Sequence, residues 1–147
     1  MNNPDSMELL SALRAVSGAM HRRNQELVRG TMLKGYHVNH ILRLAEGGPQ
    51  TAKELTEELA VDKGHTSRVL NDLLELGYIR RTGDGRRSPL ELTDMGLAIA
   101  EKARASLIPV DEAVSRQLSP ADYEVFLRVL RLIGALLDPD TSEVTGE

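Results

Sequence analysis

Two pairs of arginines lie close together in the middle of the chain, Arg80 with Arg81 and Arg86 with Arg87. A guanidinium group donates paired hydrogen bonds to a phosphate or to the edge of guanine, and an arginine in a narrow minor groove reads the shape of that groove. The whole chain has a net charge of −4, so the arginines form a local basic segment in an acidic chain. This segment is a candidate contact surface for nucleic acid.

A second group of polar side chains precedes the arginines at helical spacing. At about 100° per residue, the apolar side chains between residues 62 and 77 share one helical face and leave a polar face opposite. That polar face carries Gly64, Ser67, Arg68 and Asn71. Arginine can bind guanine, asparagine can bind adenine, and a serine hydroxyl suits a base or a phosphate. Lys63 and His65 lie at the helix start, where free backbone N–H groups favour a phosphate.

Thr51, at the start of the preceding helix, and Ser88, beside the arginines, complete the predicted contact set. The predicted DNA contacts are Thr51, Lys63, Gly64, His65, Ser67, Arg68, Asn71, Arg80, Arg81, Arg86, Arg87 and Ser88. The simpler interpretation of the charged residues is a solvated surface hairpin, because most charge runs are solvated. Their position directly after two short helices favours the contact surface.

The elements that position these side chains follow from periodicity and capping signals. Apolar residues at three- and four-residue intervals predict helices over residues 9–28, 36–45, 51–61, 62–77, 94–118 and 119–137. The predicted N-caps are Thr51, Asp62, Thr93 and Ser119, and the predicted terminators are Gly47-Gly48-Pro49 and Gly77. Two β-prone runs, 78–81 and 90–92, flank a glycine-containing turn and predict a hairpin. Pro109 should bend or interrupt its helix.

The predicted fold is mainly α-helical with a small β-hairpin wing. Within one domain, we expect a winged helix-turn-helix at residues 35–95 and dimerisation helices at 1–34 and 96–137. The flanking helices carry more apolar surface than the winged core can cover, which favours a homodimer; the alternative is packing of these helices on each other within one chain. Residues 138–147 hold four acids and no base, which predicts a flexible tail.

Composition and missing motifs exclude several classes of protein. Zero cysteines rule out disulfides, thiolate metal ligands and thiol-based peroxide sensing. No apolar run approaches the roughly 20 residues of a membrane helix, and the N-terminal run lacks the pattern of a secretory signal. We therefore expect a cytoplasmic protein without a membrane partner. The chain has no nucleotide-binding, metalloprotease or serine-hydrolase motif, so neither an enzyme nor a cofactor is predicted.

The same segments resemble the MarR family. The matching motifs are Val61-Asp62-Lys63, Ser67-Arg68-Val69-Leu70, Leu76-Gly77-Tyr78-Ile79-Arg80-Arg81, Arg86-Arg87, Leu92-Thr93-Asp94-Met95-Gly96 and the closing Leu118 to Asp122. They occur in the family's order across residues 33–137. The resemblance implies a homodimer with intertwined first and last helices, a DNA-reading fourth helix, an arginine-tipped wing and often a small-molecule pocket between the two regions. The expected function is transcriptional regulation, in the role of a repressor. A symmetric dimer of the chain is expected to bind a palindromic operator.

Three departures from the family pattern concern the reading surface. Gly64-His65-Thr66 replaces the usual Ser-Thr-Val, so the DNA sequence read should differ from that of relatives. Asp72 stands where the family carries an arginine. Asp84, the acid that is thought to brace the wing arginines in the family, is separated from them here by Gly85.

The histidines and the wing leave alternatives open. His37 and His40, three residues apart, could share a metal ion in a metal-responsive regulator, although further ligands are missing; hydrogen-bonded histidines at a domain junction are the favoured interpretation. For a small-molecule effector, the predicted lining residues are Met20, Arg23, His37 and His40. A winged-helix protein-interaction module that never meets DNA is the other alternative, which the arginines oppose.

Overall fold

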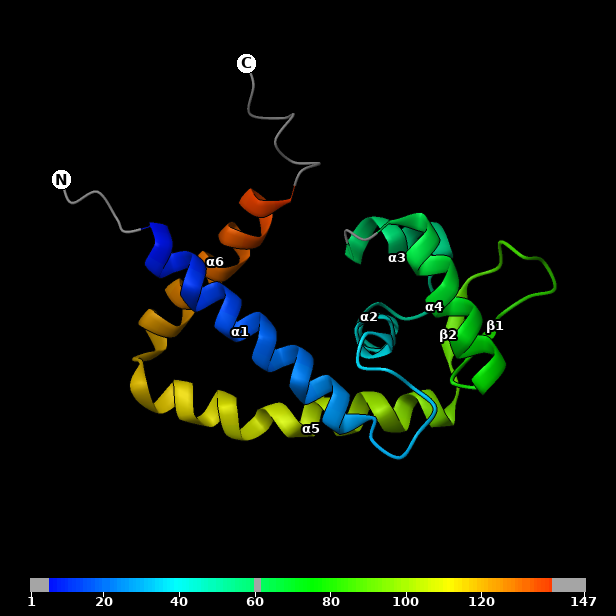
Figure 1. Ribbon diagram of the computed structural model, residues 1–147, viewed down its shortest axis with the longest axis horizontal. Helices are drawn as coiled ribbons and strands as arrows, with labels where there is room; N and C mark the ends of the chain where they lie inside the picture. The colour runs from blue at the N-terminus through cyan, green and yellow to red at the C-terminus, as the bar shows by residue number, and fades with distance from the viewer. Residues whose placement is uncertain (1–5, 60–61, 139–147) are drawn as a thin grey trace, which may run out of the picture. The chain divides into compact units, whose positions relative to one another are not determined.

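The computed structural model describes residues 6–59 and 62–138. It is mainly helical with one two-stranded sheet, which confirms the predicted fold class (Figure 1). The elements in chain order are α1 (Ser6–Leu27), α2 (His37–Gly47), α3 (Ala52–Leu59), α4 (Lys63–Leu76), β1 (Ile79–Arg81), β2 (Leu90–Leu92), α5 (Asp94–Gln117) and α6 (Pro120–Leu137). The chain divides into two compact units, Met1–Ala103 and Arg104–Glu147.

The core of the first unit is aliphatic and includes α2, α3, α4 and the hairpin. Val38 and Ile41 of α2, Leu55 of α3, and Val69 and Leu73 of α4 are all 0% exposed. Burial of such a side chain contributes about 1.5–3 kcal/mol. Because this core closes around one face of α4, the opposite face of that helix is left at the surface.

The β1–β2 hairpin is antiparallel, with Ile79 opposite Leu92 and Arg81 opposite Leu90. Gln50 adds one further rung: its backbone N donates to the Leu90 carbonyl at 3.0 Å, and its carbonyl accepts from the Leu90 N at 2.7 Å. The predicted hairpin is confirmed, with a first strand one residue shorter than expected. This rung ties the hairpin to the segment between α2 and α3.

The predicted caps of α4 and α6 are present. The Asp62 Oδ1 accepts a hydrogen bond from the His65 N at 2.7 Å, and the Ser119 Oγ accepts one from the Asp122 N at 3.1 Å. α4 ends at Gly77, whose φ of 84° lies in the left-handed region that favours glycine. These local signals explain why the helices begin and end where they do.

The start of α5 packs directly on the hairpin. Thr93 Oγ1 donates to the Gly77 carbonyl at 2.6 Å and accepts from the Gly96 N at 3.4 Å. A Cβ at Gly96 would lie only 2.2 Å from the Tyr78 carbonyl oxygen, so this approach requires glycine. The contact holds the hairpin against the first turn of α5.

Pro109 does not interrupt α5, contrary to one of the two outcomes predicted for it. The helix runs continuously from Asp94 to Gln117 with Pro109 inside it. A proline removes one backbone hydrogen bond and crowds the carbonyl four residues earlier. Ala105 and Pro109 are both exposed, so water can solvate the carbonyl that loses its partner.

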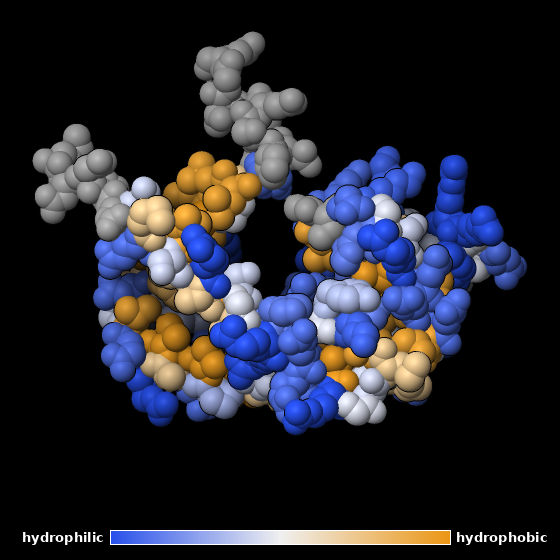
Figure 2. All heavy atoms as spheres, in the orientation of Figure 1, coloured by the Kyte–Doolittle hydropathy of each residue, from blue (hydrophilic) through white to orange (hydrophobic). Residues whose placement is uncertain are grey.

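The second unit buries none of its described residues, 104–138. Its α6 carries apolar side chains on its surface, and Figure 2 shows this hydrophobic surface in contrast to the hydrophilic loop between β1 and β2. Of the predicted acidic tail only Asp138 is described; residues 139–147 lie outside the described range, as does Val61 of the family motif. No described helix is long and apolar enough to cross a bilayer.

Candidate nucleic-acid interface

α4 has the buried and exposed faces that the sequence predicts. Thr66, Val69, Leu70 and Leu73 are buried, with exposed fractions of 4% or less. The exposed residues of the opposite face and the first turn are Lys63, Gly64, Ser67, Arg68 and Asn71, and His65 is half-buried. The predicted face is therefore confirmed as a surface, which offers a guanidinium and an amide to a partner.

The wing loop is held by hydrogen bonds of its own residues. The Arg81 guanidinium donates to the Arg86 carbonyl at 2.6 Å, and the Ser88 hydroxyl donates to the Gly85 carbonyl. Arg80 projects from β1 and pairs with Glu91 of β2, with 2.8 Å between Nε and Oε1. Arg81, Ser88 and Arg80 are thus engaged within the hairpin. In the family the wing arginines are thought to be braced by an acid. Here Arg81 holds the wing loop through its bond to the Arg86 carbonyl.

The two remaining wing arginines, Arg86 and Arg87, are exposed. Arg87 lines a hollow of about 620 Å³ that also borders the starts of α3 and α4. The hollow brings together four of the predicted contacts, Thr51, Lys63, Ser67 and Arg87. Three cationic side chains border the hollow, namely Lys53 of α3, Lys63 of α4 and Arg87 of the wing, and only one acid, Glu57, lies among the lining residues. We call it the cationic hollow. An anion is the ligand that such a hollow favours.

Lys53 was missed by reasoning from the sequence. Its position in the first turn of α3, close in sequence to the predicted contact Thr51, was the available signal. Thr66 was assigned only to the core, yet it also borders the hollow, and its buried hydroxyl has no hydrogen-bond partner among the residues that the structure describes. A buried hydroxyl without a hydrogen-bond partner among the described residues therefore lies beside the hollow.

His37 of α2 is hydrogen-bonded to Asp72 in the C-terminal half of α4. The His37 Nδ1 accepts from the Lys34 N at 2.8 Å, so the proton of the neutral ring lies on Nε2, which donates to the Asp72 Oδ2 at 2.9 Å. The Tyr36 ring lies 4.4 Å from the His37 ring, between centroids. Asp72, the departure from the family pattern, thus ties α4 to α2.

His40 is buried beside the first turn of α4. It is 1% exposed, and its ring centroid lies 5.7 Å from that of His65. Burial lowers the pKa of His40 from 6.5 to about 4; the nearby His65 and His37 lower it as well, while the Tyr36 backbone carbonyl acts in the opposite direction. The ring is therefore uncharged at neutral pH.

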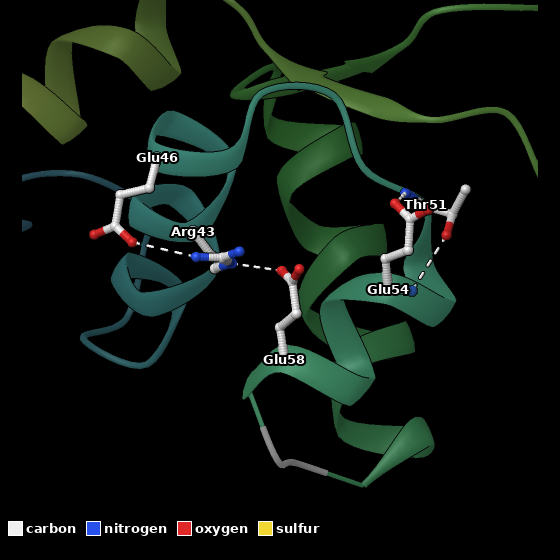
Figure 3. A network of polar contacts seen from close by, with 5 residues as sticks. All are labelled: Arg43, Glu46, Thr51, Glu54 and Glu58. Atoms are coloured by element: carbon white, nitrogen blue, oxygen red, sulfur yellow. Dashed lines mark hydrogen bonds and ion pairs between the residues drawn. The ribbon is translucent and has the colours of Figure 1, made fainter. Parts of the chain in front are cut away.

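Arg43 joins α2 to α3, as Figure 3 shows. Its guanidinium pairs with Glu58 of α3 at 2.5 Å and with Glu46 of its own helix at 3.5 Å. The bond to Arg43 lowers the pKa of the Glu58 carboxyl, and the same bond raises the pKa of Arg43. Figure 3 also shows that the predicted N-cap Thr51 is part of a capping box, in which Thr51 and Glu54 exchange hydrogen bonds of 3.0 and 3.2 Å.

The four residues predicted to line an effector pocket fall at different places. His40 borders one hollow and His37 another, and neither hollow includes Met20 or Arg23. Met20 is 40% exposed on α1. Within residues 6–59 and 62–138, no three His, Cys, Asp or Glu side chains gather as a metal site would require.

Two helices that are close in sequence, a polar face on the second helix and a hairpin with exposed arginines define the class of protein: a winged helix-turn-helix. Comparison with known proteins shows which family the chain resembles. Residues 40–88 match the family model described as MarR family. An uncharacterized HTH-type transcriptional regulator of Bacillus cereus is 36% identical over 94 residues, which are 60% of this chain and 64% of that relative. The match thus spans less than two thirds of the relative's length.

Solved structures share the fold over nearly the whole chain. A MarR protein from Peptoclostridium difficile superposes with a TM-score of 0.77 at 20% identity, covering 99% of this chain and 96% of that chain. Streptococcus pneumoniae FabT, solved in complex with DNA, gives a TM-score of 0.73 at 21% identity, covering 90% and 97%. The predicted resemblance to the MarR family is confirmed: the family-model match contains α4, β1 and most of the loop that follows β1, and the fold match extends beyond them.

Proposed function

We propose that this chain is a sequence-specific DNA-binding transcriptional regulator that acts as a homodimer. The observation that carries the proposal is the exposed polar face of α4, which lies beside a cationic hollow shared with the arginine-tipped wing. Similarity to DNA-binding relatives supports it, since FabT of the same fold was solved on DNA. The alternative, a protein-interaction module, does not explain why guanidinium and ammonium groups are concentrated around this hollow and on the wing.

In this proposal α4 enters the major groove with Arg68 and Asn71 toward base edges. The hollow between α3, α4 and the wing receives a backbone phosphate, because Lys53, Lys63 and Arg87 border it. Arg86, exposed at the wing, reaches an adjacent groove. Arg80 and Arg81 support the wing through their bonds within the hairpin and contact the phosphate backbone only secondarily.

The homodimer follows from apolar side chains that the chain leaves uncovered. Val125, Val129, Leu132 and Leu136 of α6 are 43–72% exposed and recur every three or four residues. Such a stripe on one helix needs a partner surface, and a second copy of the chain offers the same stripe under twofold symmetry. A symmetric dimer would present two reading helices about 34 Å apart and bind a palindrome with half-sites about 10 base pairs apart.

Repression is the expected outcome when such a dimer occupies a promoter, and release by a small molecule is the expected regulation. A regulator of this kind acts where genomic DNA lies, so we keep the cytoplasmic location as part of the proposal. Release requires that the effector bind one arrangement of the protein better than the other.

Selection of binding sites from random duplex DNA, with sedimentation of the free protein, tests the proposal. We expect an enriched palindrome and a dimer. The double variant Arg86→Ala, Arg87→Ala should bind that site at least about tenfold more weakly, and the salt dependence of its binding should fall by about one unit of slope for each phosphate that it no longer neutralises. The control is Arg29→Ala, which removes a 79%-exposed side chain just after α1 and should change neither quantity.

Absence of any enriched sequence, with binding to duplex DNA equal in the double variant and the control, would remove the DNA-binding function. The protein-interaction alternative would then stand, because a protein partner need not depend on the wing arginines.

A further inference from the structure

The cationic hollow between α3, α4 and the wing borders on a hydroxyl group that the fold does not use. Thr66 lines this hollow, its side chain is 1% exposed, and its Oγ1 has no hydrogen-bond partner among the residues that the structure describes. A threonine in a helix can donate to the carbonyl three or four residues earlier, and here that bond is not made. Thr66 therefore has a donor available to a group from outside the chain.

Packing gives no reason for a hydroxyl at this position. A buried hydroxyl without a partner destabilises the fold, whereas a valine would fill nearly the same space without leaving a polar atom unpaired. The family pattern that this segment resembles carries a valine at the position of Thr66. The hydroxyl is thus a feature of this chain, and its unfavourable burial points to a role in binding.

The charges around Thr66 favour an anion as the outside group. Lys53, Lys63 and Arg87 border the same hollow, and Glu57 is the one acid among its lining residues. The oxygens of a phosphate diester accept hydrogen bonds and cannot donate them, so they complement ammonium, guanidinium and hydroxyl donors together. The volume of the hollow, about 620 Å³, leaves ample room for a phosphate group.

The Thr66 hydroxyl reaches the hollow by rotation about a single bond. Its Oγ1 is covered in the free chain, whereas the residue itself lines the hollow. Threonine populates two χ1 rotamers in helices, so a turn about the Cα–Cβ bond moves the hydroxyl and leaves the backbone of α4 in place. This rotation breaks no hydrogen bond within the described chain. An anion in the hollow selects the rotamer that directs the hydroxyl toward it.

We propose that Thr66 is a phosphate-binding residue, whose hydroxyl donates a hydrogen bond to a phosphate oxygen held between Lys53, Lys63 and Arg87. The inference rests on the function proposed above for the source of the phosphate, the DNA backbone, but the same site binds free inorganic phosphate. The three cations attract at long range, whereas a hydroxyl bonds only at short range and in one direction. Thr66 therefore fixes the position of α4 along the backbone and reads no base.

Titration with inorganic phosphate tests the site without DNA. NMR follows the amide and the γ-methyl group of Thr66, with sodium chloride at equal ionic strength as the comparison. We expect saturable shifts at Thr66, Lys53 and Lys63 with a Kd of about 1–10 mM, given the few atoms of the ligand. Shifts that chloride reproduces, or that spare Thr66, would show counter-ion binding only and overturn the site.

Three threonine variants separate the hydroxyl from the rest of the hollow. Thr66→Val removes the hydroxyl and keeps the shape of the side chain, so its phosphate Kd should rise about tenfold. Thr66→Ser keeps the donor and should restore the affinity. The control Thr56→Val makes the same change beside the same hollow, where the hydroxyl already donates to the Ala52 carbonyl at 2.8 Å, and should bind phosphate as the wild type does. Equal phosphate affinity in Thr66→Val and the wild type would contradict the proposal.

The stability of Thr66→Val distinguishes a binding role from a structural one. Because the hydroxyl has no partner in the free chain, its removal should raise the midpoint of urea unfolding while it weakens phosphate binding. A lowered midpoint would mean that the hydroxyl bonds within the chain, and the donor that the proposal needs would not be available.

The selected DNA site tests whether the phosphate belongs to the DNA backbone. Thr66→Val should weaken binding about tenfold or more, by a similar factor for the selected site and for a scrambled duplex, because a phosphate contact carries no base preference. The salt dependence should stay as in the wild type, since the hydroxyl carries no charge, whereas Lys63→Ala should lower the slope by about one unit for each hollow.

The outcomes of the two binding experiments are independent. A loss confined to the selected sequence would assign Thr66 to base reading and overturn its phosphate contact. Phosphate binding that depends on Thr66, with DNA affinity unchanged in Thr66→Val, would overturn the backbone as the source. If the wild type binds phosphate through Thr66 but binds no duplex DNA, the proposed function fails and the phosphate site stands.

Discussion

The two compact units differ in how far each can bury its own apolar side chains. In the first unit five aliphatic side chains of α2, α3 and α4 are 0% exposed, whereas none of residues 104–138 in the second unit is buried. The first unit therefore holds the exposed polar face of α4 on a core of its own. The second unit presents apolar surface that only another surface can cover, which is the physical basis for expecting a partner chain.

The largest effect should come from emptying the core of the first unit. Leu73→Ala removes a fully buried side chain of α4 and should lower the free energy of unfolding by about 2–5 kcal/mol, through reduced burial and a residual cavity. Chemical denaturation at fixed protein concentration measures this.

The matched control is Leu97→Ala, at a leucine of α5 that is 52% exposed, where we expect a loss of about 1 kcal/mol or less. Equal losses at both positions would mean that the first unit does not depend on its own core, and the contrast between the units would fail.

Much of the first unit could be predicted because its signals are local. The caps at Asp62 and Thr51, the termination at Gly77 and the division of α4 into two faces each depend on residues within one or two helical turns. The exposed candidates Arg68 and Asn71 followed from that division. Local rules suffice where the contacts that matter are close in sequence.

Contacts between distant segments could not be predicted in this way. The His37–Asp72 bond joins residues 35 positions apart, and its formation depends on how α2 packs against α4. The burial of His40 and its place beside His65 depend on the same packing. Pro109 shows the reverse case, in which a strong local signal for interruption is overridden because the helix around it is open to water.

The second unit should respond to substitutions of its exposed stripe through assembly. The double change Val129→Ser, Leu132→Ser on α6 removes apolar surface that is 43% and 55% exposed in one chain. In a symmetric dimer it acts twice, so we expect the dimer dissociation constant to rise about a hundredfold. Sedimentation over a range of concentrations measures it.

Arg128→Ser, at an exposed neighbour on the same helix, is the control for helix propensity and should leave assembly unchanged. A double variant that sediments as the wild type would show that this stripe is covered by something other than a second copy, and the homodimer would need another surface.

The smallest expected effect is a loss of folding stability at low pH, which should arise in the first unit and not in the second. The pKa of His40 falls from 6.5 to about 4 on folding. Between pH 6.5 and pH 4 the His40 ring is therefore protonated in the unfolded chain and neutral in the folded chain. Stability should be lost as pH falls through that window, by about 2 kcal/mol between pH 7 and pH 5 from this residue. The second unit has no buried residue among 104–138 and cannot contribute a loss of this origin.

His40→Phe removes the titrating ring and should reduce the pH dependence of the unfolding free energy by about that amount, while His21→Phe should reproduce the wild-type pH dependence. Only the change in unfolding free energy between two pH values matters, so the expectation holds even if the phenylalanine alters stability at both. If the two variants lost equal stability on acidification, folding would leave the pKa of His40 unchanged. The lowered pKa of His40 in the folded chain would then be wrong.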